Sequence, residues 1–181
     1  MINRELYMEQ ITPFIDKPFV KVITGIRRCG KSVVLRLIRE ELLRRGVSED
    51  YIIYMNFESF EWIDMKEAKA LYAHIREATK ASGKYYILLD EIQEVTDWEK
   101  AVNAFLVDLD VDIYVTGSNS RLLSSEFSTY LAGRYVAFHI MTLSFREYLL
   151  FHDLPLTISV SDRKTEFLKY LRMGGFPAIH T

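Results

Sequence analysis

The sequence has few of the residues that mark an unusual class of protein. Its one cysteine, Cys29, excludes an internal disulfide and has no His or Cys companions at the spacing of a metal cluster. No apolar run approaches the roughly 20 residues that a membrane-spanning helix requires. The start, Met1 to Gln10, also lacks the apolar core of a signal peptide. We therefore expect a cytoplasmic protein with no membrane partner.

Strong charge of either sign is also missing. The formal net charge is -2, which argues against a chain that mainly coats nucleic acid and leaves room only for a local basic patch. The four histidines are scattered, and none has a partner at metal-ligand spacing. With 49% hydrophobic residues, a chain of 181 residues is expected to form a globular protein with a substantial core.

Short apolar runs alternate with amphipathic segments, which is typical of a parallel sheet covered by helices. Five runs rich in Val, Ile, Tyr and Phe predict strands at Phe19 to Thr24, Tyr51 to Asn56, Tyr85 to Asp90, Asp112 to Thr116 and Tyr135 to Ile140. The sequence therefore predicts an α/β fold with a parallel five-stranded sheet flanked by helices.

Apolar stripes at helical spacing predict three helices between these strands, and we interpret each stripe as core. The stripes are Val34, Leu35, Ile38 and Leu42, then Ala68, Leu71, Ile75 and Ala78, then Trp98, Val102, Phe105 and Leu109.

Local signals also predict where helices begin and end. Capping-box intervals from Asp64 to Glu67 and from Ser144 to Glu147 predict two helix starts. Gly46 predicts the end of the first long helix.

The strongest chemical signal is the segment Gly25 to Ser32, Gly-Ile-Arg-Arg-Cys-Gly-Lys-Ser, which fits the phosphate-loop pattern GxxxxGK followed by Ser or Thr. The segment lies between a predicted strand and a predicted helix, where backbone N–H groups converge on phosphates. Lys31 would supply positive charge to the β and γ phosphates, and the Ser32 hydroxyl would coordinate Mg²⁺. The alternative is a glycine-rich turn that binds nothing.

We include the whole run from Gly25 to Val33 in the predicted nucleotide site; its members are Gly25, Ile26, Arg27, Arg28, Cys29, Gly30, Lys31, Ser32 and Val33. Glycines allow the backbone to wrap an anion without Cβ clashes. The two arginines are interpreted as solvated residues at the loop tip, with direct contact to a phosphate or a partner as the alternative. Cys29 is expected to be structural, because no His partner accompanies it.

A second signal is the apolar run Tyr85 to Leu89, which ends in Asp90 and Glu91 and resembles a Walker B strand. Asp90 is predicted to hold Mg²⁺ through its water shell, and Glu91 to act as the base that orients the attacking water. Many strands end in acidic residues, so the motif is weak alone. Because ligands of open α/β sheets bind beyond the carboxyl ends of strands, we expect one Mg-nucleotide to meet both motifs.

Polar residues follow the fourth predicted strand as well. Ser118 or Asn119 is a candidate sensor that hydrogen-bonds the attacking water or the leaving phosphate. A helix N-cap formed by Asn119 or Ser120 explains the same residues equally well.

Together these segments resemble a prokaryotic ATPase family of the AAA+ superfamily. The resemblance spans nearly the whole chain and rests on the phosphate loop, Leu-Leu-Asp-Glu-Ile-Gln from Leu88, Thr-Gly-Ser-Asn from Thr116, Leu-Ala-Gly-Arg ending at Arg134, and Gly-Gly-Phe-Pro from Gly174. The resemblance implies a P-loop NTPase of the additional-strand class, with a strand such as Tyr51 to Asn56 inserted in sequence between the two motif strands. It also implies ATP as the ligand and a second domain of obscure function after the ATPase core.

The resemblance also draws attention to Arg134. By analogy, this arginine would reach a nucleotide in the same chain or in a neighbouring copy of a homo-oligomer. Pairing with a surface carboxylate explains Arg134 equally well.

We expect residues 1–155 to form the P-loop ATPase core and residues 156–181 to form a helical extension. The helical pattern runs to Met173 and is broken by the segment Gly174 to Pro177, after which no compact element follows. We interpret this extension as the start of a truncated C-terminal region.

The main functional hypothesis is Mg-dependent ATP binding and hydrolysis. The competing hypothesis is a switch in which nucleotide occupancy reshapes the domain to control a protein or nucleic-acid partner, with negligible hydrolysis. A small-molecule kinase fits less well, because no arginine-rich lid is evident in the sequence. GTP fits less well than ATP, because no Asn-Lys-x-Asp string occurs.

Overall fold

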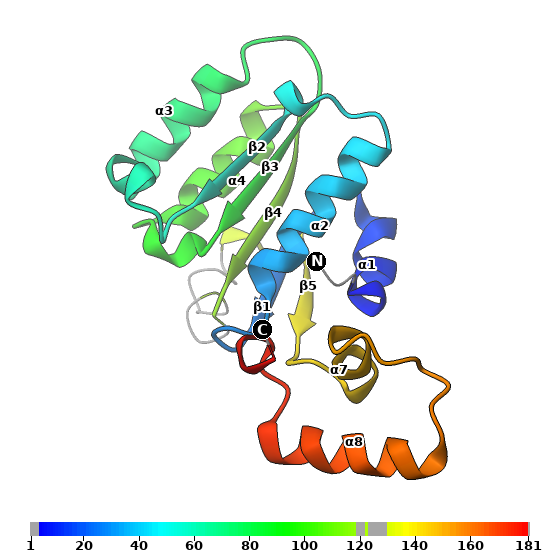
Figure 1. Cartoon of the computed structure of the whole chain (residues 1–181). Helices are drawn as coiled ribbons and strands as arrows, with labels where there is room; N and C mark the ends of the chain where they lie inside the picture. Colours follow the sequence, from blue (N-terminus) through cyan, green and yellow to red (C-terminus); the bar gives the residue numbers. More distant parts are fainter. Residues whose placement is uncertain (1–3, 119–121, 123–129, 181) are drawn as a thin grey trace.

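A parallel sheet with helices on both faces forms the centre of the protein (Figure 1). The computed structural model describes residues 4–118, 122 and 130–180. The sheet has the order β2-β3-β4-β1-β5, and all four neighbouring pairs are parallel. The strands are β1 (Val20–Gly25), β2 (Ile52–Asn56), β3 (Tyr85–Asp90), β4 (Val111–Gly117) and β5 (Tyr135–Ile140). The predicted five-stranded α/β fold is therefore confirmed, and each predicted strand end lies within one residue of the observed end.

The order of the strands in the sheet differs from their order in the sequence around the two motif strands, β1 and β3. In sequence, β2 lies between the two motif strands β1 and β3. In the sheet, β4 separates β1 from β3, and β2 forms one edge. Residues that follow β1, β3 and β4 therefore emerge side by side at the carboxyl edge of the sheet.

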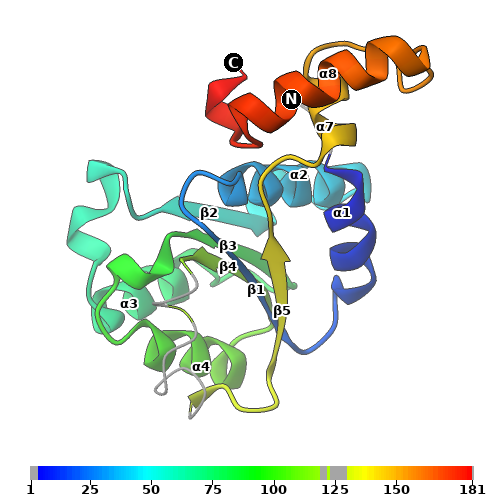
Figure 2. The same cartoon turned by 90° about the horizontal axis from the view of Figure 1, so that it is seen from below.

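Two pairs of helices cover the two faces of the sheet (Figure 2). On one face lie α1 (Glu5–Ile11) and α2 (Lys31–Arg44), and on the other lie α3 (Ala68–Ala78) and α4 (Trp98–Asp108). Most members of the three predicted apolar stripes are buried against the sheet, because the strands are apolar on both faces. Ala78 is an exception, since it is the exposed last residue of α3.

One predicted helix start is confirmed and the other is wrong. At α7 (Phe145–Phe151), the Ser144 hydroxyl accepts the Glu147 N–H at 3.3 Å, and the Glu147 carboxylate accepts the Ser144 N–H at 2.8 Å. Asp64 instead lies inside the 3₁₀ helix η3 (Phe60–Met65), and α3 begins only after Glu67. The helix starts late because Glu67 is extended and forms an isolated parallel bridge with Thr96.

A glycine and several 3₁₀ turns mark connections that the structure describes. Gly46 follows α2 with a positive φ, as predicted for a helix end. Further 3₁₀ turns are η1 (Thr12–Phe14), η2 (Glu49–Tyr51), η4 (Ile92–Glu94) and η5 (Pro177–Ile179).

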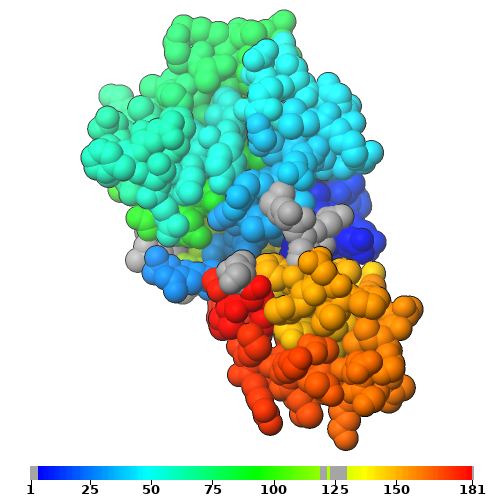
Figure 3. Space-filling view, in the orientation of Figure 1, coloured from blue at the N-terminus to red at the C-terminus, as the bar shows by residue number. Residues whose placement is uncertain are grey.

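The residues beyond β5 form a lobe at one end of the core (Figure 3). The lobe contains α7 and α8 (Val160–Met173), which pack through aromatic rings, with Phe145 and Phe167 centred 5.1 Å apart. Within α8, which the structure describes in full, no residue is buried. Of the helices that the structure describes, none is long and apolar enough to cross a membrane.

A buried ion pair joins β1 to β4 near the amino edge of the sheet. The side chains of Lys21 and Asp112 are 0% and 1% exposed and contact each other directly. Asp112 also accepts the Tyr114 hydroxyl at 2.9 Å and the Asp16 N–H at 2.8 Å. Burial lowers the pKa of Lys21, and the charge of Asp112 opposes that shift.

We expect Asp112→Ala to lower the free energy of unfolding by about 3–5 kcal/mol, because the substitution leaves a buried ammonium group unpaired. Combining it with Lys21→Met should recover much of this loss, since the double variant buries no charge at the pair. Urea denaturation measures both, with exposed Asp64→Ala as the control. An equal loss in the single and double variants would contradict this account.

Candidate functional site

The phosphate loop connects β1 to α2 and depends on glycine at two positions. A Cβ at Gly25 would lie 2.4 Å from the Ile140 carbonyl oxygen of β5, so only glycine fits against that strand. Gly30 has a φ of +105°, a left-handed conformation that favours glycine, and caps α2. The loop is therefore packed against the sheet, and the first N–H groups of α2 stand at its end.

The start of α2 has the properties of an anion site. The helix begins at Lys31 and runs for 14 residues, so its first N–H groups have no partner within the helix. These groups and the helix dipole together favour a negative group beyond the N-terminus. Ser32 is half-buried in the same turn.

The two motifs meet at the side chain of Glu91. Lys31 Nζ lies 3.1 Å from Glu91 Oε1, and the two side chains are 3% and 15% exposed. Gln93 Nε2 donates to Glu91 Oε2 at 2.5 Å, so both carboxylate oxygens have a partner. The φ of Glu91 is +54°, and its N–H donates to Thr116 Oγ1 at 3.0 Å. A positive φ at a residue other than glycine is costly and is often found at functional sites.

Asp90 is fully buried at the end of β3 and is oriented from both neighbouring strands. The Tyr54 hydroxyl of β2 donates to Asp90 Oδ2 at 3.1 Å, and the Thr116 hydroxyl of β4 donates to Asp90 Oδ1. Burial and the charge of Asp90 raise the pKa of Tyr54 well above its ordinary value, so Tyr54 remains a hydrogen-bond donor at neutral pH.

Sequence reasoning assigned no role to Tyr54, Gln93 or Thr116, although each lies in or just after a predicted strand. Thr116 ends the fourth predicted strand. Because the carboxyl ends of the strands are expected to converge, its position in the sequence could have identified it as a site residue. Tyr54 gave no such signal, because aromatic residues are common inside strands.

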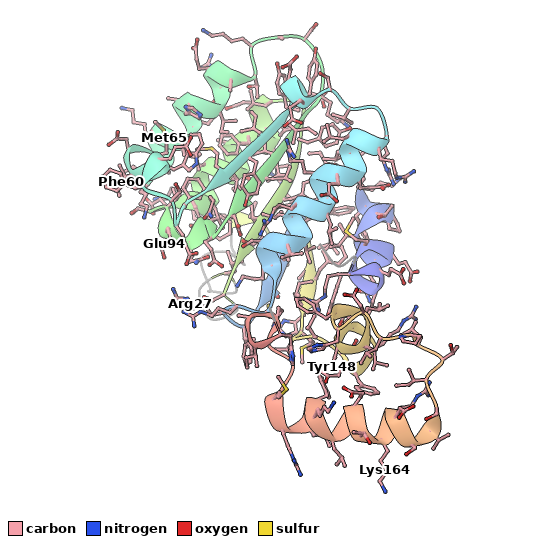
Figure 4. All side chains as sticks on the ribbon, in the orientation of Figure 1. Arg27, Phe60, Met65, Glu94, Tyr148 and Lys164 are labelled. Atoms are coloured by element: carbon pink, nitrogen blue, oxygen red, sulfur yellow. The ribbon has the colours of Figure 1, made fainter. Side chains whose placement is uncertain are left out.

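A pocket of about 260 Å³ opens beside these residues and is lined by Arg27, Lys31, Glu58, Glu91, Gln93, Glu94 and Ser118. Figure 4 shows Arg27 and Glu94 at the same end of the sheet. A larger hollow of about 710 Å³ lies between α1 and α2, and none of the predicted site residues lines it. Shared motif residues make the smaller pocket the candidate nucleotide site.

The other predicted residues of the loop differ in their exposure. Ile26, Arg27 and Arg28 are exposed, and Arg27 Nη2 lies 3.6 Å from Glu58 Oε1. Val33 is half-buried in the first turn of α2. Cys29 is fully buried, and burial raises the pKa of its thiol, which disfavours the reactive thiolate.

The structure does not bring Arg134 to the phosphate loop of the same chain. The Arg134 carbonyl accepts the Val20 N–H at 2.8 Å, at the start of β1, whereas the loop follows the other end of that strand. At about 3.3 Å per residue, the two ends of β1 are roughly 16 Å apart. Among the residues that the structure describes, the exposed Arg134 side chain donates to Asn103 Oδ1 at 3.0 Å.

Of the two candidate sensor residues, Ser118 lines the pocket beside Lys31 and Glu91. Asn119 and the alternative cap residue Ser120 lie outside the described residues.

Asp90 and Ser32 are the two residues that the sequence predicts as Mg²⁺ ligands. Among the described residues, no three His, Cys, Asp or Glu side chains come together as a metal site. Mg²⁺ does not need such a cage, because it is commonly bound by one or two carboxylates together with substrate phosphates. Asp90, buried and oriented at a strand end, and Ser32, in the first turn of α2, are suitable donors for this arrangement.

Comparison with known proteins finds a matching family model and relatives of this chain. A family model described as an AAA domain matches residues 17–149. An uncharacterized protein of Haemophilus influenzae is 43% identical over 180 residues, which are 99% of this chain and 44% of that protein. The chain spans less than half the length of the curated relatives that it matches.

Solved structures share the fold. AMPPCP-bound DnaA from Aquifex aeolicus aligns with a TM-score of 0.63 at 15% identity, covering 99% of this chain and 60% of that one. The ORC1 protein of Aeropyrum pernix in complex with DNA aligns with a TM-score of 0.56 at 16% identity, covering 99% and 58%.

We expect Tyr54→Phe to lower the free energy of unfolding by about 1–3 kcal/mol, because the buried Asp90 carboxylate loses a hydrogen-bond donor. Tyr72→Phe is the matched control, since Tyr72 donates to Asp108 at 2.6 Å on the exposed surface. Guanidinium denaturation compares the two variants. Equal changes in both would show that the burial of Asp90 does not matter.

Proposed function

The chain belongs to the AAA domain family, and from this premise we propose that it binds ATP with Mg²⁺ and hydrolyses the β–γ phosphoanhydride bond. One observation carries the proposal: Lys31 of the phosphate loop lies 3.1 Å from Glu91 after the second motif strand, beside the buried Asp90. The proposal thus rests on the proximity of three groups: the proposed anion site at Lys31, the proposed metal ligand Asp90 and the proposed base Glu91.

In the proposed complex, the amides at the start of α2 and the Lys31 ammonium bind the phosphates. Asp90 and Ser32 would hold Mg²⁺, which would neutralise negative charge that develops on the phosphates during transfer. Little covalent chemistry is required of the protein, so the catalytic contribution of these residues is positioning and electrostatic stabilisation.

Glu91 is the proposed base, and its present partners suggest how it is controlled. Lys31 and Gln93 occupy its two carboxylate oxygens. A γ phosphate carries more negative charge than a carboxylate and competes for Lys31. When Lys31 turns toward the phosphates, Glu91 Oε1 is released to accept a proton from water, so nucleotide binding would activate the base.

The same contacts favour a second candidate function, a nucleotide switch with little hydrolysis. If the contacts to Lys31 and Gln93 persist when nucleotide is bound, Glu91 cannot accept a proton and the complex is long-lived. Single-turnover measurements separate the candidates, since an ATPase converts one bound equivalent of ATP and a switch releases it unchanged.

Arg134 enters this proposal only through a second copy of the chain. Arg134 lies at the amino ends of the strands, far from the phosphate loop of its own chain. We therefore propose that Arg134 contacts the nucleotide of a neighbouring subunit. The partner of this chain is likewise a proposal, because the chain covers 44% and 39% of two relatives. The A. pernix neighbour is in complex with DNA, which makes DNA the first partner to test.

We expect Lys31→Ala to abolish Mg-dependent ATP binding in calorimetry, because it removes the cation of the phosphate site. Glu91→Gln should retain binding and lower the turnover number by about 10²- to 10⁴-fold, since an amide cannot accept the proton.

Lys80→Ala and Glu77→Gln are the matched controls, because these residues form an ion pair that is 68% and 70% exposed. Turnover that survives Glu91→Gln would rule out Glu91 as the base, and ATP binding that survives Lys31→Ala would rule out the phosphate loop as the site.

If Arg134 acts between subunits, specific ATPase activity should rise with protein concentration, and Arg134→Ala should remove that rise. Arginine fingers contribute about 10³- to 10⁵-fold in rate, so the effect is measurable at low occupancy of the oligomer. Activity that is independent of concentration would assign Arg134 to structure alone.

A further inference from the structure

A buried arginine just before α1 connects three segments that are far apart in the sequence. Arg4 is 3% exposed, and each of its guanidinium nitrogens donates a hydrogen bond. Nε donates to Glu147 Oε1 of α7 at 2.5 Å, Nη1 to the Cys29 carbonyl of the phosphate loop at 2.9 Å, and Nη2 to the Met141 carbonyl after β5 at 2.9 Å. The guanidinium also lies 4.7 Å from the centre of the Tyr7 ring.

The burial of this side chain requires its partners. A buried charge is costly unless it is paired and hydrogen-bonded, and here one carboxylate and two carbonyls satisfy it. Lysine would carry the same charge but cannot reach three separate acceptors with a planar fork. The arrangement is therefore specific for arginine.

The contact with Cys29 fixes part of the phosphate loop. In a trans peptide the carbonyl and the following N–H point in opposite directions, so holding the Cys29 carbonyl also sets the direction of the Gly30 N–H. Amides of this loop are the groups that a phosphate needs. Arg4 thereby orients the Gly30 amide of this loop.

The contact with Glu147 ties the same guanidinium to the C-terminal lobe. Glu147 is also the acidic member of the capping box at the start of α7. The next residue, Tyr148, donates to Glu166 of α8 at 3.0 Å, so α7 and α8 are linked. Figures 1 and 2 both show α7 beside α1, at the end of the core where the lobe is attached.

We propose that Arg4 is a positioning residue that holds the phosphate loop in its nucleotide-binding geometry and couples that geometry to α7. The proposal rests on ATP binding at the phosphate loop. A nucleotide that orders the loop should then stabilise the placement of α7, and by thermodynamic reciprocity a weakened contact to α7 should weaken nucleotide binding.

The experiment measures the Kd of Mg-ATP by calorimetry and the hydrogen exchange of residues 145–151 with and without nucleotide, in the whole chain. Arg4→Lys should raise the Kd at least about tenfold, because it loses charge-assisted hydrogen bonds that position the loop. Glu147→Gln should raise the Kd in the same direction by less. In both variants, the protection that nucleotide gives to α7 in the native chain should be lost.

Arg146→Lys is the matched control and should behave as the native chain, because Arg146 is 65% exposed and pairs with Glu5 at 3.4 Å on the surface. All measurements are made well below the midpoint of thermal unfolding, so that a role in stability alone leaves the Kd unchanged. Should Arg4→Lys fail to fold, Glu147→Gln decides.

A native Kd with native protection of α7 in the folded variants overturns the role of Arg4 and leaves ATP binding in place. Absence of ATP binding by the native chain overturns the proposed function, and the role of Arg4 with it.

Discussion

The parallel pairing of the five strands is the constraint on which the rest of the structure depends. Because neighbouring strands run in the same direction, consecutive strands are joined by crossovers, and all the carboxyl ends lie on the same side of the sheet. The phosphate loop, the acidic pair and Ser118 follow three strands that are adjacent in the sheet. A site that reads as three distant segments in the sequence is thus one place in space.

Much of the fold and the centre of the site follow from local patterns. Patterns among neighbouring residues predict the strands, the apolar stripes on α2 and α4, and the position of the loop before Lys31. The misplaced start of α3 shows the limit, because a bridge to Thr96 outweighs a local capping signal. Arg4 and Lys21 were not predicted for the same reason: their acceptors are far away in the sequence, and no spacing reveals them.

The ion pairs at the amino ends and at the carboxyl ends of the strands differ in their access to solvent. At the amino edge, Lys21 and Asp112 are closed off from solvent and joined to one another, an arrangement that can only stabilise the fold or cost stability when broken. At the carboxyl edge, Lys31 and Glu91 form a similar pair that opens onto a pocket. The second pair is therefore open to a ligand that enters the pocket, whereas the first pair is not.

The buried Cys29 has a practical consequence. As the only cysteine in the chain, it lies inside the phosphate loop, where its thiol is shielded and kept protonated. A thiol reagent therefore reaches Cys29 only when the loop opens, so the rate of alkylation measures how often the loop opens. The native chain thus carries its own kinetic probe of the loop, with no label to introduce and no other thiol to mask.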